Sequence, residues 1–415
     1  MSFGGGELCG KAAPPPSKSH THRAVFLAAM ADGRSRLSNV LASEDTKATM
    51  RASKAMGAKL EWADGALVVD GGRLHAPVGT VDAANSGTTM RIFSGLASMF
   101  DSRVTIDGDA SLRKRPMGPL LEALAQTGTE CESEDGKPPV TVRGPNLGGA
   151  VRIDGGVSSQ FVTSLLMASP MLPSDSEITV EGKTVSEPYL DVTTHMMRLF
   201  GADVKKDGRT FLVRGGTGYR PCDYRVPADF SSAAFPLVAG ALGGAVTVEG
   251  LDMSDPQGDK AIIDILRMSG ADVAATGGRV AVRKAPLSAL EIDISGIPDL
   301  FPILAVLLNT AKGTSRLYGA PQLRFKESDR IRTSEAMLRA IGADMTGTDD
   351  GCVIRGRPVL KGGHVENEGD HRIMMAAAVA SLACESPVTM DGAECCAVSY
   401  PSFPEEMKGL GMRVV

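Results

Sequence analysis

The sequence predicts an α/β fold built from six similar units, with three units in each of two domains. A glycine that follows an expected helix recurs at intervals of about 70 residues. Within each interval, a β-like run ends in a small turn and an apolar helical segment precedes that run. A chain of 415 residues is also too long for one ordinary hydrophobic core.

The helix-ending glycines define the period of the repeat. Four of them open the pattern Gly-Ala-charged-apolar, as in Gly201-Ala202-Asp203-Val204. Glycine is favoured just past a helix end because it tolerates the left-handed backbone conformation. The six positions are Gly57, Gly128, Gly201, Gly270, Gly342 and Gly411.

The segments between these glycines predict the order strand, helix, strand, helix, strand, strand. The turn glycines that end the β-like runs are Gly108, Gly182, Gly250, Gly319 and Gly392. The helices expected before these runs span 20–31, 86–100, 158–170, 229–242, 299–312 and 370–384. Two short strands close each unit, as at 210–214 and 280–283. Such alternation implies right-handed crossovers with helices packed on sheets.

The starts of these helices carry the polar chemistry. Each expected start falls on a residue type that caps helices: Ser19, Ser86, Ser158, Asp229, Asp299 and Asp370. Lysine, arginine and amide side chains cluster around them, although the chain as a whole is acidic. A helix N-terminus offers free N–H groups and the positive end of its dipole, so it favours anions. Symmetry-related units place these starts at one end of the fold, which predicts a polyanionic small-molecule ligand.

Composition excludes several classes of partner. The net charge is −5 and aromatic residues make up 4% of the chain, which disfavours nucleic acid and anionic membranes. The seven cysteines form no CxxC pair, so we expect reduced thiols, and no Cys/His cluster predicts a metal site. Neither a signal pattern nor an apolar run of about 18 residues is present, so a soluble, cytoplasmic protein is expected.

Eight motifs in a fixed order resemble those of the 5-enolpyruvylshikimate-3-phosphate synthases, within the enolpyruvyl transferases. The resemblance runs from Pro14 to about Phe403. The motifs are PSKS at 16–19, NSGTTMR at 85–91, DGDASLRKRPM at 107–117, SSQF at 158–161, SEPY at 186–189, IPD at 297–299, KESDR at 326–330 and DHR at 370–372.

This resemblance implies a two-domain inside-out α/β barrel that closes on its ligand. The chain would cross between domains near Pro15–Pro16 and Pro227–Ala228. One domain would then comprise residues 1–15 and 228–415, and would carry the acid–base groups on the phosphoenolpyruvate side. The other, residues 16–227, would bind shikimate 3-phosphate.

The resemblance further implies an enzyme activity, a transferase reaction without metal or organic cofactor. The enolpyruvyl group of phosphoenolpyruvate would pass to the 5-hydroxyl of shikimate 3-phosphate by addition and elimination, with release of phosphate. This step belongs to the shikimate pathway, which makes chorismate for aromatic amino-acid biosynthesis. We expect a monomer.

The resemblance also assigns roles to individual residues. Asp299 would accept the hydroxyl proton, Glu327 would be the partner acid–base group, and Lys18 would assist catalysis. Shikimate 3-phosphate would contact Lys18, Ser19, Arg23, Ser158, Ser159, Gln160, Ser186, Asp299, Gln322 and Lys326, with Tyr189 beside them. Phosphoenolpyruvate would contact Lys18, Gly87, Arg115, Gln160, Arg330 and Arg372. Arginine suits this task because its planar fork binds carboxylate and phosphate bidentately.

The residues alone leave alternatives open. Asp299 could be a helix cap, Glu327 and Lys326 a solvated pair, and His371 a structural histidine. The lysine that the family often carries before its C-terminal Phe/Tyr-Pro step is absent from 397–401, so the remaining cations or Lys408 would replace it.

Three other classes compete with this interpretation. A UDP-N-acetylglucosamine enolpyruvyl transferase would typically carry a reactive cysteine in the loop 108–116, which has none. A non-catalytic anion-binding repeat protein would gain nothing from Asp299 and Glu327. An RNA-end cyclase-like protein shares the repeat unit but fits poorly with an acidic, aromatic-poor chain.

Overall fold

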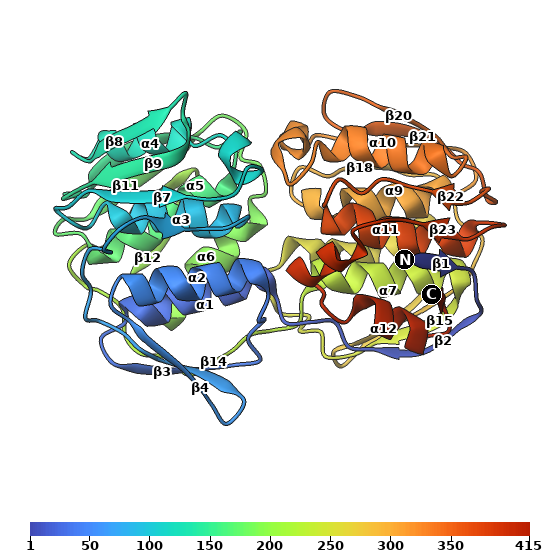
Figure 1. Cartoon of the computed structure of the whole chain (residues 1–415), viewed down its shortest axis with the longest axis horizontal. Helices are drawn as coiled ribbons and strands as arrows, with labels where there is room; N and C mark the ends of the chain where they lie inside the picture. The colour runs from blue at the N-terminus through green and yellow to red at the C-terminus, as the bar shows by residue number, and fades with distance from the viewer. The chain divides into compact units, whose positions relative to one another are not determined.

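The computed structural model describes all 415 residues, which divide into two compact units (Figure 1). Unit 1 comprises Met1–Pro15 and Pro227–Val415, and unit 2 comprises Pro16–Val226. The chain therefore begins in unit 1, builds unit 2 and then returns.

Six four-stranded sheets form the outer layers of the two units, three sheets in each. Every sheet contains one parallel strand pair, followed by two antiparallel neighbours. The sheets of unit 2 have the orders β14-β3-β5-β4, β6-β7-β9-β8 and β10-β11-β13-β12. Those of unit 1 have the orders β16-β17-β15-β2, β18-β19-β21-β20 and β22-β23-β1-β24.

Unit 2 repeats the predicted order of elements three times. Its strands are β3 (Arg34–Ser38), β4 (Lys59–Ala63), β5 (Ala66–Asp70), β6 (Val81–Asp82), β7 (Val104–Asp107), β8 (Glu130–Glu134), β9 (Lys137–Arg143), β10 (Gly149–Asp154), β11 (Ser176–Glu181), β12 (Val204–Asp207), β13 (Thr210–Val213) and β14 (Tyr224–Arg225). Its helices are α1 (Lys18–Met30), α2 (Glu44–Ala55), α3 (Gly87–Ala97), α4 (Gly118–Ala125), α5 (Ser159–Ala168) and α6 (Pro188–Leu199).

Unit 1 follows the same pattern. Its strands are β1 (Ser2–Gly4), β2 (Leu8–Ala12), β15 (Gly244–Val248), β16 (Asp272–Thr276), β17 (Arg279–Arg283), β18 (Glu291–Asp293), β19 (Thr314–Tyr318), β20 (Asp344–Gly347), β21 (Cys352–Arg355), β22 (Gly363–His364), β23 (Val388–Thr389) and β24 (Arg413–Val414). Its helices are α7 (Phe230–Gly243), α8 (Ile262–Ser269), α9 (Phe301–Asn309), α10 (Arg330–Ala340), α11 (His371–Ala380) and α12 (Phe403–Gly409).

Three sheets are completed by strands that are distant in sequence. Strand β14 pairs in parallel with β3, almost 190 residues earlier in the chain. In unit 1, β2 pairs in parallel with β15, and β1 lies between β23 and β24. The first 15 residues are thus structural members of unit 1.

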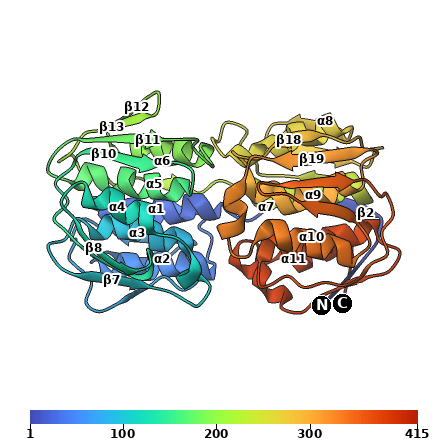
Figure 2. The same ribbon diagram turned by 90° about the horizontal axis from the view of Figure 1, so that it is seen from above.

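One helix of every repeat is buried on nearly all sides, and Figure 2 shows these helices inside the layer of sheets of each unit. In α9 every residue from Phe301 to Asn309 is buried, and in α11 every residue is buried. A helix that is apolar all round belongs in a core. Gly95 of α3 shows how small residues permit the packing, because its N–H donates to Ser164 Oγ of α5 at 3.0 Å.

The six helix-ending glycines all adopt positive φ angles, between 87° and 111°. The predicted helix starts are correct at four positions, where Ser86, Ser158, Asp229 and Asp370 accept a hydrogen bond from the first helical turn. The other two predicted caps are wrong.

Ser19 is the second residue of α1, which is capped instead by Ser17. Prolines 14–16 fix an extended backbone, and the helix starts directly after it. Asp299 lies in a short 3₁₀ turn, Pro298–Leu300, that precedes α9. Pro302 has no N–H to donate to a cap at Asp299, and the Phe301 N–H donates to the Pro298 carbonyl instead.

Candidate active site

The start of α1 in unit 2 carries the predicted lysine. Lys18 Nζ lies 3.2 Å from Asp45 Oδ2 at the start of α2, and both side chains are at most 15% exposed. Burial strengthens such a pair and fixes the ammonium group in place. Sequence reasoning did not find Asp45, because an acidic residue in a first helical turn is adequately explained by the helix dipole.

Arg23 lies one turn further along α1 and is buried. Its guanidinium donates to Thr193 Oγ1 at 2.8 Å, to the Ser19 carbonyl at 2.9 Å, and to Thr163 Oγ1 and the Tyr189 carbonyl at 3.3 Å. Burial lowers the pKa of Arg23 to about 10. Arg23 therefore links α1, α5 and α6 through hydrogen bonds. Its predicted direct contact with the phosphate of a substrate stays a prediction.

The starts of α3 and α5 meet through a network of polar side chains. Arg91 Nη1 donates to Gln160 Oε1 at 2.8 Å and to Ser158 Oγ at 3.3 Å. Gln160 Nε2 donates in turn to Thr88 Oγ1 at 2.8 Å. Arg91 was not among the predicted ligands, although it stands inside the NSGTTMR motif.

Gly87 leaves room for an arginine at the same place. A Cβ atom on Gly87 would lie 3.0 Å from Arg115 Nη1 and 3.9 Å from Gln160 Oε1. Arg115 Nη2 donates to Asn85 Oδ1 at 2.8 Å. The structure therefore brings together Gly87, Arg115 and Gln160, three of the residues predicted to bind phosphoenolpyruvate.

The two remaining predicted serines of unit 2 are buried at helix starts. Ser159 is the first residue of α5, and Ser186 precedes α6. Ser186 has a φ of 55°, a left-handed conformation that is uncommon for serine. Unfavourable backbone geometry of this kind concentrates at functional sites.

In unit 1, three cations surround Asp299. Its Oδ1 accepts from Arg330 Nη1 at 2.8 Å and from Lys326 Nζ at 3.3 Å, and its Oδ2 accepts from Arg372 Nη2 at 3.2 Å. These residues come from the KESDR and DHR motifs, some 30 and 70 residues away. The structure thus brings together Asp299, Lys326, Arg330 and Arg372, four of the predicted site residues, whose roles toward the substrates stay predictions.

Arg330 occupies the centre of this cluster. Besides Asp299, it donates to Glu327 Oε2 at 2.7 Å and to Asp370 Oδ2 at 2.9 Å. Burial disfavours its charge, but Asp370, Glu327 and Asp299 outweigh that cost and raise the pKa of Arg330. The same bond holds Glu327 beside Asp299, so it is not a purely solvated side chain.

Lys326 is surrounded by charged groups, whereas the Gln322 amide has no hydrogen-bond partner. Burial, reinforced by Arg330 and Arg372, lowers the pKa of Lys326. The buried amide of Gln322, in the turn Pro321–Phe325, has no hydrogen-bond partner at either polar atom. A buried amide of this kind is costly unless another molecule satisfies it.

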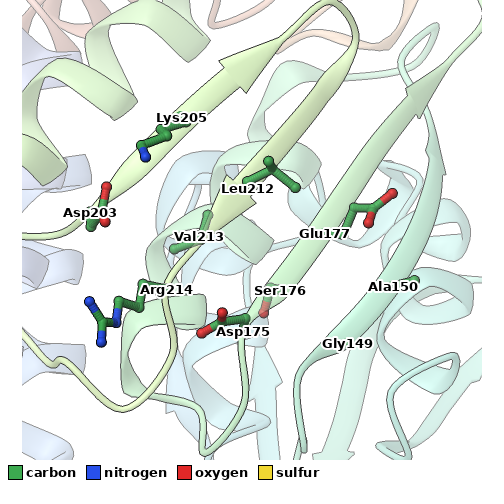
Figure 3. Close-up of a pocket in the computed structure, with 10 residues that line it drawn as sticks. All are labelled: Gly149, Ala150, Asp175, Ser176, Glu177, Asp203, Lys205, Leu212, Val213 and Arg214. Carbon is green, nitrogen blue, oxygen red and sulfur yellow. The ribbon is translucent and has the colours of Figure 1, made fainter.

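A surface hollow of unit 2 lies away from these side chains. It has a volume of about 690 Å³ and is lined by β10, β11, β12, β13 and their flanking residues in unit 2 (Figure 3). None of the predicted site residues lines it. The converging polar side chains, and not the shape of this surface, therefore identify the candidate site.

Every helix of the structure is too short or too polar to span a membrane.

Six repeated α/β units with arginine- and lysine-rich helix starts define an enolpyruvyl transferase. The chain belongs to the EPSP synthase (3-phosphoshikimate 1-carboxyvinyltransferase) family, whose model matches residues 3–407. The predicted family, fold class and transferase activity are thereby confirmed, and the alternative classes are not favoured.

Individual relatives agree with this assignment. A 3-phosphoshikimate 1-carboxyvinyltransferase from Methanocorpusculum labreanum is 48% identical over 98% of this chain and 97% of its own length. One from Halobacterium salinarum is 42% identical over 97% and 96%. The EPSP synthase structure from Acinetobacter baumannii has a TM-score of 0.84 at 31% identity, covering 100% and 99% of the two chains. The enolpyruvyl transferase NikO from Streptomyces tendae shares the fold, with a TM-score of 0.81 at 19% identity over 99% and 97%.

Proposed function

We propose that this protein transfers the enolpyruvyl group of phosphoenolpyruvate to the 5-hydroxyl of shikimate 3-phosphate and releases phosphate. The observation that carries the proposal is the position of Asp299. Its carboxylate is held by Arg330, Arg372 and Lys326. A carboxylate oriented by fixed partners is suited to accept a proton from a bound hydroxyl.

The reaction requires two proton transfers, and the cluster offers two carboxylates. As the 5-hydroxyl oxygen attacks the enol carbon of phosphoenolpyruvate, its proton passes to Asp299. The methylene carbon gains a proton from Glu327, which lies beside Arg330. Elimination then breaks the carbon–oxygen bond to phosphate: the methyl group returns a proton to Glu327, and the departing phosphate takes up the proton that Asp299 had accepted. Each correctly placed acid or base contributes roughly 10²–10⁴-fold in rate.

The two substrates explain the surrounding cations, because each carries a phosphate and a carboxylate. Lys18, Ser19, Arg23, Ser158, Ser159, Gln160, Ser186, Gln322 and Lys326 would bind shikimate 3-phosphate. Lys18, Gly87, Arg115, Gln160, Arg330 and Arg372 would bind phosphoenolpyruvate. The unpartnered amide of Gln322 supports the first assignment, since a ligand hydroxyl would satisfy it.

Several parts of the proposal extend beyond the site. The enzyme would act as a cytoplasmic monomer, without metal or organic cofactor, in the route to chorismate and the aromatic amino acids. The arginines of the site would supply the affinity that the family's C-terminal lysine often provides, because Val398 stands at that place and Lys408 is exposed on α12.

Phosphate release provides the test. The protein is incubated with phosphoenolpyruvate and either shikimate 3-phosphate or UDP-N-acetylglucosamine, and phosphate is measured over time. We expect release with the shikimate substrate alone. Release only with the nucleotide sugar, or with neither acceptor, would contradict the proposal.

A further inference from the structure

A second buried carboxylate of unit 1, which interacts electrostatically with Asp299, has no role in the mechanism above. Asp259 belongs to the short turn Gly258–Ala261 and is 2% exposed. Its Oδ2 atom accepts a hydrogen bond from Ser231 Oγ in the first turn of α7. Its Oδ1 atom is buried and has no hydrogen-bond partner.

The turn that carries Asp259 is fixed to the start of α7. Gln257 accepts from the Phe230 N–H and donates to the Ala228 carbonyl, both at 3.1 Å. Helix α7 also packs against the turn Pro298–Leu300, which carries Asp299. The two carboxylates therefore lie on segments that pack against the same helix.

The charged groups around Asp259 come from four segments. Asp299 acts on it from the turn before α9, Arg372 from α11, and Asp229 from the start of α7. On its own segment, Lys260 is engaged by the carbonyl groups of Met253 and Asp255. Asp299 in turn contacts Lys326, Arg330 and Arg372.

A purely structural role explains this carboxylate poorly. The hydrogen bond from Ser231 needs only one oxygen acceptor, which a neutral amide would supply. The ionised carboxylate, with one unpaired buried oxygen, costs free energy that the neutral acid does not. An ionised Asp259 therefore requires an explanation beyond packing.

We propose that Asp259 is a positioning residue whose buried charge, acting on Asp299 and Arg372, sets the strength of Asp299 as a proton acceptor. The inference rests on the proposed function, in which Asp299 receives the hydroxyl proton. Ionised Asp259 repels the charge of Asp299 and favours the arrival of a proton there. It also offsets the three cations, which would otherwise make Asp299 a weak base.

The pKa of Asp259 lies close to neutral pH, where the activity would be measured. Burial, followed by the charge of Asp299, raises the pKa of Asp259 to about 7, although Arg372 and Ser231 oppose the shift. Asp259 therefore changes charge near neutral pH. Turnover should rise as Asp259 loses its proton, because Asp299 then becomes a stronger base.

The test compares kcat across about pH 6–8.5 for the wild type, Asp259→Asn and Ser231→Ala. Asparagine mimics protonated Asp259. We expect Asp259→Asn to match the wild type near pH 6 and to fall roughly 3- to 10-fold below it near pH 8. Ser231→Ala should move the rise in kcat to higher pH while retaining the upper plateau, because the lost hydrogen bond stabilises the ionised form.

A matched control and a parallel variant separate the possible failures. Asp264→Asn removes an exposed carboxylate on the adjacent helix α8 and should leave kcat unchanged at every pH. A loss in Asp259→Asn that is equal at all pH values, or no loss at all, would overturn the inference.

If Asp259→Asn does not fold, an unshifted profile in Ser231→Ala overturns the inference by itself. The Asp299→Asn variant tests the proposed function independently, since near-normal turnover there would remove Asp299 as the acceptor. Loss of turnover in Asp299→Asn together with unshifted profiles would refute only the role of Asp259.

Discussion

Arg330 donates from Nε to Oδ2 of Asp370 at 2.9 Å, and neither side chain is more than 1% exposed. Asp370 also caps α11 through the Arg372 N–H, and accepts from Ser328 Oγ at 3.0 Å. One carboxylate thus binds the Arg330 side chain and caps the helix turn that carries Arg372, the other arginine that contacts Asp299. The geometry of the proposed proton acceptor, Asp299, therefore depends on a residue to which no substrate contact is assigned.

Replacing Asp370 by asparagine should destabilise the protein more than replacing an exposed partner nearby. Asparagine retains an oxygen for the cap but leaves the buried charge of Arg330 poorly compensated, so we expect a loss of about 3 kcal/mol. Glu368→Gln, which removes the exposed pair with Arg332, should cost about 1 kcal/mol or less. Urea unfolding measures the free energy of unfolding of both variants. Equal losses would contradict the expectation that the buried ion pair matters more than the exposed one.

Asp299→Asn should lower kcat by at least about 100-fold, because the amide cannot accept the hydroxyl proton. The KM for shikimate 3-phosphate should change much less. Asp293→Asn, an exposed carboxylate just before the same turn, provides the control and should keep normal kinetics. A large rise in KM with unchanged kcat would assign Asp299 to binding instead.

Glu327→Gln should also reduce kcat far more than it weakens substrate binding. The glutamine side chain still fills the place beside Arg330, but it cannot exchange a proton with the methylene carbon. Rapid-quench measurement of the first turnover, combined with equilibrium binding of shikimate 3-phosphate, would separate the two effects. Normal single-turnover rates would exclude Glu327 as the acid–base group.

Gln322→Ala should weaken the binding of shikimate 3-phosphate without lowering stability. The buried amide has no partner in the chain, so its removal breaks no internal hydrogen bond. We expect Kd to rise about 10-fold, which corresponds to one lost hydrogen bond to the ligand, and Tm to stay constant or increase. Calorimetric titration and thermal unfolding provide the two values. A marked fall in Tm with unchanged Kd would point to a packing role.

The stability difference between Asp259→Asn and the wild type should depend on pH. The pKa of Asp259 is raised to about 7, so between about pH 4 and 7 the native protein holds a proton that the unfolded chain has lost. The contribution of Asp259 to the free energy of unfolding of the wild type therefore falls as pH rises through that window, and it is constant above it. The asparagine side chain does not titrate. The free energy of unfolding of the variant, relative to that of the wild type, should therefore increase by up to about 4 kcal/mol between pH 4 and 8. Parallel curves across this range would contradict the shift.

Local signals in the sequence predicted the repeat and most helix starts, because caps and left-handed glycines are determined by neighbouring residues. Asp299 shows where that reasoning ends. Its residue type suits a cap, yet Pro302 removes the N–H that a cap requires, and only the fold shows which cations take its place. Asp45 and Asp259 could not be found at all, since their partners Lys18 and Ser231 are 27 and 28 residues away. The ligand roles of the two units stay predictions.

The interleaving of the N-terminal segment has a consequence for the order in which the protein is made. Unit 2 is contiguous, so all its strands have left the ribosome once residue 226 has emerged. Unit 1 must wait, because β1 has no neighbours until β23 and β24 are synthesised. Its first strands remain unpaired during most of translation, and pairing over such sequence separations is slow. We therefore expect the inserted unit to fold first, while the other unit completes its fold only after β24 has been synthesised.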